Sequence, residues 1–372
     1  MAELRVGVLA HLTGRLSLLG PPMRFAAQRW QHRRTPAGDQ LRITLADTGS
    51  EPDPAVAAVT RLVRVDGVRL ILTLGGTHTV PAIAAACARL GVPCLSTTLP
   101  WQVYHSARAT ADWGFHFCWG LDDIAHAFAD AWTSTGRCGP VGCLWNDGPQ
   151  GRALRASEFA AVAADRGVEL VDPGGYAEDR ADFRTQIAAF RAAGVQTVTA
   201  AATPGDLRRF HRAAAGAGLS PELLTCSRWL SYPDGAHRSG VDDVATAVYW
   251  SPEHPFRSAA DGTDCSELAA RFSRATGQEW LQPLGLAYAL GEICWQVLST
   301  TADPTEPAAL AERLRRAHVH TVAGPVDWTT GPAAGIASLP LATGQWQAGE
   351  LVVVANERTP DVPLGGRLRL AR

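Results

Sequence analysis

The sequence predicts an α/β protein with two lobes, each a parallel sheet flanked by helices. Short apolar runs rich in β-branched residues alternate with helical stretches of roughly 10–15 residues, which is typical of right-handed βαβ units. This series runs as far as Gly120 and then begins again. The chain has 372 residues, which is enough for two or three domains at roughly 100–200 residues each.

The first series predicts four strands. Residues 4–10 form a short apolar run, and a loop over 13–20 follows it. Pro21 and Pro22 suit the first turn of a helix, which we expect over 23–32. The later strands are apolar runs, and the helices between them carry apolar residues at helical spacing. These elements are strands at 41–47, 70–74 and 92–96, with helices that begin at 53 and 81.

The second series repeats the alternation, and a hairpin is expected near the end of the chain. The predicted strands are 140–145, 168–171, 197–201 and 222–226. The predicted helices are 124–133, 152–166, 183–193, 204–217 and 285–298. Residues 344–347 and 351–354 flank a turn at Gly349, so we expect them to pair as the hairpin.

Loops that follow strand ends are the expected ligand-binding segments, because open parallel sheets bind ligands beyond the carboxyl ends of their strands. They are rich in small polar residues and Trp, which suits a cleft with backbone N–H groups, hydroxyls and aromatic walls. The loops are 13–20, 75–79, 96–104, 145–151, 202–205 and 227–232.

Charge and hydropathy exclude two classes of protein. Basic residues number 34 against 36 acidic ones, for a net charge of −2, whereas nucleic-acid binding needs a cationic surplus. The longest uncharged stretch, between Arg69 and Arg89, contains Gly and Pro and does not form a membrane span. The first residues show no export leader. Either the protein is cytoplasmic or its export signal is absent from this sequence.

Metal, cofactor and enzyme signatures are absent from the sequence. The eight Cys form no C-x-x-C pair and the His show no metal-binding spacing, so no metal site is expected. The chain has no Lys, no G-x-S-x-G and no dinucleotide fingerprint after the first strand, so we expect no cofactor and no enzyme activity. Cys118 and Cys138 are the pair to test for a disulfide.

Five segments, in order along the chain, carry a resemblance to a known family. They are residues 6–14, 47–54, 91–96, 324–328 and 345–349. Together they resemble the type I periplasmic-binding-protein superfamily, in the branch of leucine/isoleucine/valine-type receptors of ABC transporters. The resemblance covers essentially the whole chain.

The resemblance implies two Rossmann-like lobes joined by a three-segment hinge, with crossovers near 120–122, 250–255 and 325–329. Lobe one is then residues 1–120 with 253–326, and lobe two is residues 121–252 with 327–372. Such proteins bind a small-molecule ligand between their lobes by hinge closure and deliver it to ABC permease subunits outside the cytoplasm. A monomer is expected, with a dimer as the alternative. The rival functions are a cytoplasmic ligand sensor on the same fold and, less favoured, an enzyme.

The resemblance also places ligand contacts in lobe one, in the loops after its third and fourth strands. Hydroxyl and backbone N–H groups of such receptors hold the ligand carboxylate there, and the matching residues are Gly76, Thr77, His78, Thr97 and Thr98. For Thr77 and Thr98 the alternative is a helix N-cap, and His78 suits either role equally.

In lobe two the sequence departs from the family pattern. Ser227, Arg228 and Trp229 stand where an acidic residue would hold an amino group, Gln150 stands in place of a Tyr, and Thr203 stands where aromatics occur. Arg228 suits a bidentate pair with a carboxylate, or is a surface residue. Trp rings near the loops suit a planar ligand, with packing as the alternative. A planar or aromatic carboxylate is therefore favoured over an amino acid. The full predicted set is Leu18, Gly76, Thr77, His78, Thr97, Thr98, Trp101, Trp145, Gln150, Thr203, Arg228 and Trp229.

Overall fold

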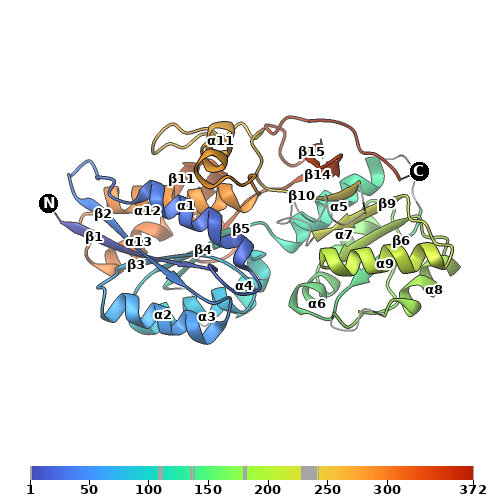
Figure 1. Ribbon diagram of the computed structural model, residues 1–372, viewed down its shortest axis with the longest axis horizontal. Helices are drawn as coiled ribbons and strands as arrows, with labels where there is room; N and C mark the ends of the chain where they lie inside the picture. Colours follow the sequence, from blue (N-terminus) through green and yellow to red (C-terminus); the bar gives the residue numbers. More distant parts are fainter. Residues whose placement is uncertain are drawn as a thin grey trace. The chain divides into compact units, whose positions relative to one another are not determined.

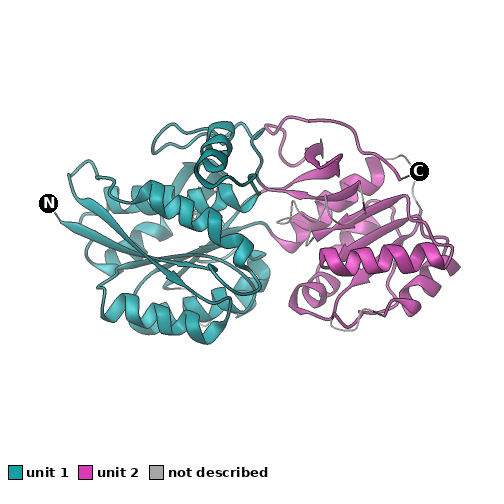
Figure 2. Cartoon of the chain, in the orientation of Figure 1, with its two compact units in different colours: residues 1–119, 250–339 teal, residues 120–249, 340–372 magenta. Residues whose placement is uncertain are grey.

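The computed structural model describes residues 2–107, 112–134, 136, 139–178, 182–227, 241 and 243–371. The chain divides into two compact units, each assembled from separate stretches of sequence (Figure 2). Unit 1 comprises residues 1–119 and 250–339, and unit 2 comprises residues 120–249 and 340–372. The last division falls at 339–340 rather than 326–327, because β13 (Ile336–Ser338) pairs with β5 (Gly114–Cys118) of unit 1.

The sheet of unit 1 has six parallel strands in the order β13-β5-β4-β3-β1-β2. Its other strands are β1 (Glu3–Ala10), β2 (Gln40–Asp47), β3 (Leu70–Leu74) and β4 (Cys94–Thr97). Every residue of β3, β4 and β5 is buried, as expected for a parallel sheet covered on both faces. Helices α2 (Pro52–Arg64) and α3 (Thr79–Leu90) cover one face, and α1 (Gly20–Trp30) and α12 (Pro283–Thr300) cover the other (Figure 1).

Helix α12 is buried along most of its length, with apolar side chains on all sides, so it is a core helix of unit 1. Shorter elements complete the unit. The short elements are η1 (Ser17–Leu19), α4 (Trp101–Ala107), α11 (Cys265–Thr276), α13 (Pro307–Arg315), β11 (His318–Thr321) and β12 (Gly324–Asp327).

The sheet of unit 2 has seven strands in the order β15-β14-β10-β9-β8-β6-β7. They are β6 (Val141–Trp145), β7 (Leu170–Val171), β8 (Thr197–Ala201), β9 (Leu223–Cys226), β10 (Val244–Val248), β14 (Ala342–Gln347) and β15 (Glu350–Ala355). The strands from β10 to β7 are parallel, whereas β14 and β15 join antiparallel as the expected hairpin. The prediction of parallel sheets flanked by helices is confirmed in both units.

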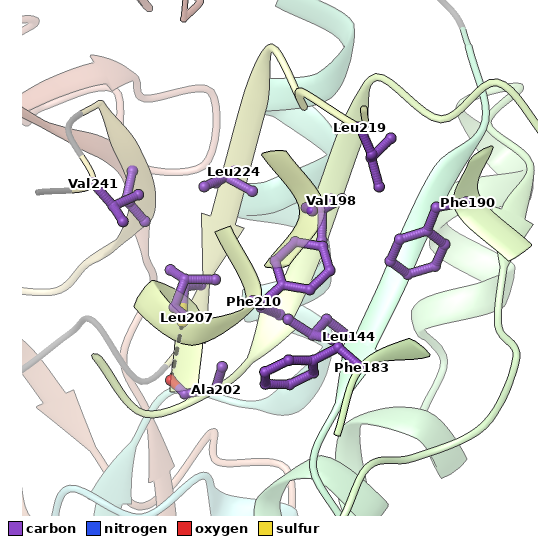
Figure 3. Packing of buried hydrophobic residues seen from close by; sticks show 14 of the residues in the cluster. Leu144, Phe183, Phe190, Val198, Ala202, Leu207, Phe210, Leu219, Leu224 and Val241 are labelled. Atoms are coloured by element: carbon purple, nitrogen blue, oxygen red, sulfur yellow. Dashed lines mark hydrogen bonds between the residues drawn. The ribbon is translucent and has the colours of Figure 1, made fainter. Parts of the chain in front are cut away.

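Two helical layers cover this sheet. Helices α8 (Arg184–Ala192) and α9 (Pro204–Gly216) pack on one face around the rings of Phe183, Phe190 and Phe210 (Figure 3). The ring of Phe210 meets those of Phe183 and Phe190 edge-on, at centroid distances of 5.7 and 6.2 Å. Helices α5 (Leu121–Ser134) and α7 (Phe159–Asp165) contact each other and build a second aromatic layer.

The helix predicted at 152–166 is in fact two helices, α6 (Pro149–Ala156) and α7. Ser157 ends α6 with an extended backbone (ψ −178°), and its hydroxyl accepts a hydrogen bond from the N–H of Phe159. Serine side chains compete with the helical backbone in this way, which apolar spacing alone does not reveal.

Three predictions of absence or pairing concern the chain as a whole. No helix in the described ranges combines the length and apolar character that a membrane span requires. The same residues hold no group of three or more His, Cys, Asp or Glu able to bind a metal ion. Cys118 is buried in β5, but Cys138 lies outside the described residues, so the proposed pairing stays a prediction.

Candidate functional site

Four neighbouring strands of unit 1 end at one edge of its sheet, and the loops after them are joined by side chains. In sheet order the joined residues are Thr48 after β2, His11 after β1, Gly75 after β3 and Thr98 after β4. The Thr48 hydroxyl bonds to Nδ1 of His11 at 2.9 Å. The Thr98 hydroxyl accepts a bond from the N–H of Gly75 at 2.9 Å and lies 2.8 Å from the Gly75 carbonyl. These contacts fix the relative positions of the four loops.

The ring of His11 is buried between the loops after β2 and β3. Its side chain is inaccessible to solvent, and burial, followed by the nearby charge of Arg15, lowers the pKa of His11 to about 4. The ring is therefore neutral at neutral pH. Its second ring nitrogen faces Gly75 so closely that a methyl group at Gly75 would overlap it, which explains why glycine stands there.

The loop after β1 is fastened to the end of β2. A carboxylate oxygen of Asp47 accepts bonds from the N–H groups of Leu12 (2.9 Å) and Thr13 (3.3 Å), and the other accepts the Thr13 hydroxyl at 2.6 Å. Burial alone would raise the pKa of Asp47, but these hydrogen bonds outweigh it and lower the pKa. The Ser50 hydroxyl donates to the carbonyl of Thr13 and accepts the N–H of Leu16. The loop is thus held by fixed contacts.

The predicted unit 1 residues lie on these loops. Gly76 and Thr77 are half-buried and His78 is exposed, in the turn before α3. Helix α3 has no side-chain cap bond, so the N-cap alternative for Thr77 does not describe this structure. The hydroxyl of Thr97 donates to the carbonyl of Phe117 at 2.6 Å, inside the sheet.

Two further predicted residues of unit 1 differ in exposure. Leu18, in η1, has 49% of its surface exposed, which is unusual for a large apolar side chain. Trp101 is half-buried at the start of α4. Its backbone N–H donates to the backbone carbonyl of Trp119 at 3.0 Å.

Thr98 has the most unusual backbone of this edge. Its φ of +76° lies in the left-handed region, where a β-branched residue is strained. The bonds between its hydroxyl and Gly75 hold it there. The ligand-binding role of Thr98, which the family resemblance implies, stays a prediction. Strained residues held by their surroundings are concentrated at functional sites.

Replacing Thr98 by Val should destabilise the protein by about 1–3 kcal/mol, because the N–H of Gly75 loses its partner. Thr98→Ser keeps the hydroxyl and should remain within about 0.5 kcal/mol of the wild type. Chemical denaturation of both variants measures the difference. Equal stability of the two variants would show that the bond to Gly75 contributes nothing.

In unit 2 the predicted residues have different roles. Gln150, in the first turn of α6, donates from its amide to the hydroxyl of Ser227 beyond β9, at 3.3 Å. Thr203 caps α9, since its side chain accepts the N–H of Asp206 at 3.1 Å.

Arg228 and Trp229 lie outside the described residues. Their predicted roles stay predictions.

Trp145 has its ring in the core of unit 2. It is 2% exposed and meets the ring of Phe159 at a centroid distance of 5.1 Å. Leu144 belongs to the core beneath α8 and α9, so alternation along β6 turns Trp145 toward the opposite helical layer. The packing alternative stated for the Trp residues therefore describes this ring.

The set of site residues predicted from the sequence does not include His11 and Asn146, two buried polar residues that order these loops. Asn146 is buried after β6; its side-chain oxygen accepts the N–H of Gly148 at 2.9 Å and its amide bonds to the carbonyl of Ala201. Each residue stands directly after a strand whose last five residues are buried, and a polar residue in that position is the only signal that the sequence offers for them.

A sequence model of the periplasmic binding protein family matches residues 3–350. The chain belongs to this family. Its members are periplasmic substrate-binding proteins. The family predicted from the sequence is thereby confirmed.

Solved structures of periplasmic binding proteins share the fold. A leucine-binding protein of Thermotoga maritima is 16% identical with a TM-score of 0.77, over 95% of this chain and 98% of that one. A solute-binding protein of R. palustris in complex with 4-hydroxybenzoate is 13% identical with a TM-score of 0.75, over 100% and 97%. LivJ of Streptococcus pneumoniae, in complex with isoleucine, is 13% identical with a TM-score of 0.71, over 94% and 97%. No curated protein sequence matches this periplasmic binding protein.

Proposed function

We propose that this protein is a non-enzymatic, extracytoplasmic solute-binding protein that captures a small organic acid and delivers it to an ABC importer. The observation that carries the proposal is the set of hydrogen-bonded loops at the carboxyl ends of the strands in unit 1. There Thr77 and the backbone N–H groups before α3 stand beside the loop of Thr98, which is joined to theirs through Gly75. Hydroxyls and N–H groups at a helix start suit a carboxylate.

A planar or aromatic acid is the proposed ligand class, ahead of an aliphatic amino acid. An α-amino acid also presents an ammonium group, which needs an acidic partner, and Asp47 already uses its carboxylate to hold the loop after β1. In unit 2, Ser227 stands after β9 where the family's acidic residue would be. Half-buried Trp101 supplies an aromatic surface close to Thr98 in sequence. Relatives bind either class, as the complexes with 4-hydroxybenzoate and isoleucine show for those two proteins.

A thermal-shift screen over aromatic acids, aliphatic amino acids, amides and sugars tests the ligand class. An aromatic carboxylate present at about 100 times its dissociation constant should stabilise the protein by about 2.7 kcal/mol. The bound compound should be recovered chemically unchanged. A shift confined to leucine-like amino acids would refute the proposed ligand class.

Arg228→Ala tests whether unit 2 contributes to recognition of the carboxylate. If Arg228 pairs with the ligand, the variant should weaken binding of an acid by about 2–3 kcal/mol while binding of a neutral amide analogue changes little. Arg274→Ala, an exposed arginine of α11 in unit 1, is the matched control. Equal affinity of the two variants for the acid would make Arg228 a surface residue.

A further inference from the structure

A groove of about 410 Å³ runs between α8 and α9 on unit 2. Its apolar lining includes Ile187 and Ala188 of α8. From the other helix it includes Ala213, within α9, and Ala217, which directly follows α9. Alanines at these positions leave the space between the helices open, since their side chains end at the methyl group. Phe183 also lines the groove and belongs, with Phe210, to the buried core of unit 2 (Figure 3).

The rim of the groove is cationic. Arg184 and Arg191 stand on α8, and Arg209 stands on α9. Arg184 pairs with Asp182 at 2.6 Å and Arg209 pairs with Asp206. Arg191 is exposed and forms no ion pair with any carboxylate among the described residues. Three guanidinium groups therefore face two carboxylates, which leaves net positive charge on the rim.

These charges are held loosely. The side chains of Arg184 and Arg209 are 90% and 56% exposed, and ion pairs in water contribute at most about 1 kcal/mol. An isolated small anion here would stay hydrated and gain little. A protein segment that covers the alanine floor would instead bury apolar surface and remove the rim charges from water, which strengthens their pairing.

We propose that this groove docks an acidic, partly apolar segment of a partner protein. The alanines receive the apolar side chains of the segment, and Arg191 receives a carboxylate, with Arg184 and Arg209 free to turn toward others. The contact area of such a groove is well below that of a stable complex, so the docking is weak and transient. The inference concerns unit 2 alone and does not depend on the identity of the captured ligand.

The test uses the full chain and a labelled helical peptide that carries Glu along one face and Ala and Leu along the other. Fluorescence anisotropy should show binding that weakens as salt is added, and a matched peptide with Gln in place of Glu should not bind. Arg191→Glu should weaken binding about tenfold, and Ala213→Trp, which fills the groove, should abolish it. Arg69→Glu, the same charge change at an exposed arginine of unit 1, should leave it unchanged.

Three results with the peptides and variants would overturn the proposal, and a fourth, with succinate, would replace it. They are failure of the Glu peptide to bind, equal binding of the Gln peptide, and equal losses in Arg191→Glu and Arg69→Glu. Succinate that competes with the peptide at comparable concentration and depends equally on Arg191 would replace the docking segment with a small-anion site. Thermal melts of each variant show that it is folded. The groove variants should retain the thermal shift with the captured ligand, so failure of docking and failure of ligand capture are read separately.

Discussion

Glu292→Gln is expected to stabilise the protein above about pH 5 and to remove much of its loss of stability toward alkaline pH. Glu292 lies in α12 with no exposed surface, and one carboxyl oxygen accepts the N–H of Val322 at 3.1 Å. Burial is the main cause that raises the pKa of Glu292 from its ordinary value of 4.5 to about 8, and the nearby charge of Asp261 adds to it. Hydrogen bonds from Ser258 and Val322 oppose the shift without cancelling it.

The sign follows from proton binding. Between pH 4.5 and about 8 the folded protein holds a proton on Glu292 that the unfolded chain releases. The stability of the fold is therefore complete below pH 4.5 and declines as the pH rises through this window, by about 3–5 kcal/mol in total. Glutamine keeps the shape and a hydrogen-bonding oxygen but cannot ionise, so the decline is absent from the variant.

Chemical denaturation at several pH values between 4 and 9 measures this effect. Glu279→Gln, which removes the same charge from an exposed position, is the control. The difference in unfolding free energy between the two variants should be small near pH 4 and grow toward pH 8. A difference that stays constant with pH would show that Glu292 is ionised in the folded protein.

The sequence predicted those elements whose signal is local. Strands such as β3 and β8 are short apolar runs bounded by turns, so their burial can be inferred from a few residues. Strand β5 was not predicted, and it holds a polar residue, His116, inside a fully buried strand. The structure accommodates this histidine through distant partners: Ser96 at 2.8 Å, the carbonyl of Leu99 at 2.7 Å, and the ring of Tyr104 stacked at 4.2 Å.

The candidate site shows the same limit. The resemblance to the family indicated the loops of Thr77 and Thr98, but the bond that orders them joins Thr98 to Gly75, 23 residues earlier in the chain. The closeness of Gly75 to His11 depends on the order of strands in the sheet, with β1 beside β3. Such contacts follow from topology, so residue spacing predicts where ligand loops lie better than it predicts what holds them.

Trp30→Ala is expected to cost about 3–5 kcal/mol of stability. Trp30 ends α1, is 1% exposed, and packs on the backbone of α12. A methyl group at Gly291 would overlap its indole ring. Arg33 lies over the same ring at 4.4 Å and pairs with Asp261 at 2.9 Å. Loss of the indole therefore opens a cavity between α1 and α12 and removes the surface on which Arg33 stacks.

The close contact between Trp30 and Gly291 makes the sign of a second substitution depend on the first. In the wild type, Gly291→Ala should destabilise the protein by about 1–3 kcal/mol, because the added methyl group forces the indole out of place. In the Trp30→Ala background that group enters empty space, and alanine is favoured over glycine inside a helix by about 1 kcal/mol. There Gly291→Ala should be stabilising.

Gly285→Ala provides the matched control for this cycle. Gly285 lies six positions earlier on α12, and a methyl group there would overlap Trp250 instead of Trp30. Its cost should therefore be the same in both backgrounds, within the additivity expected of separate sites, about 0.5 kcal/mol. If Gly291→Ala destabilises both backgrounds equally, the helix needs glycine for a reason other than Trp30. Reversal at Gly291 alone would show that the glycine is there to admit the indole.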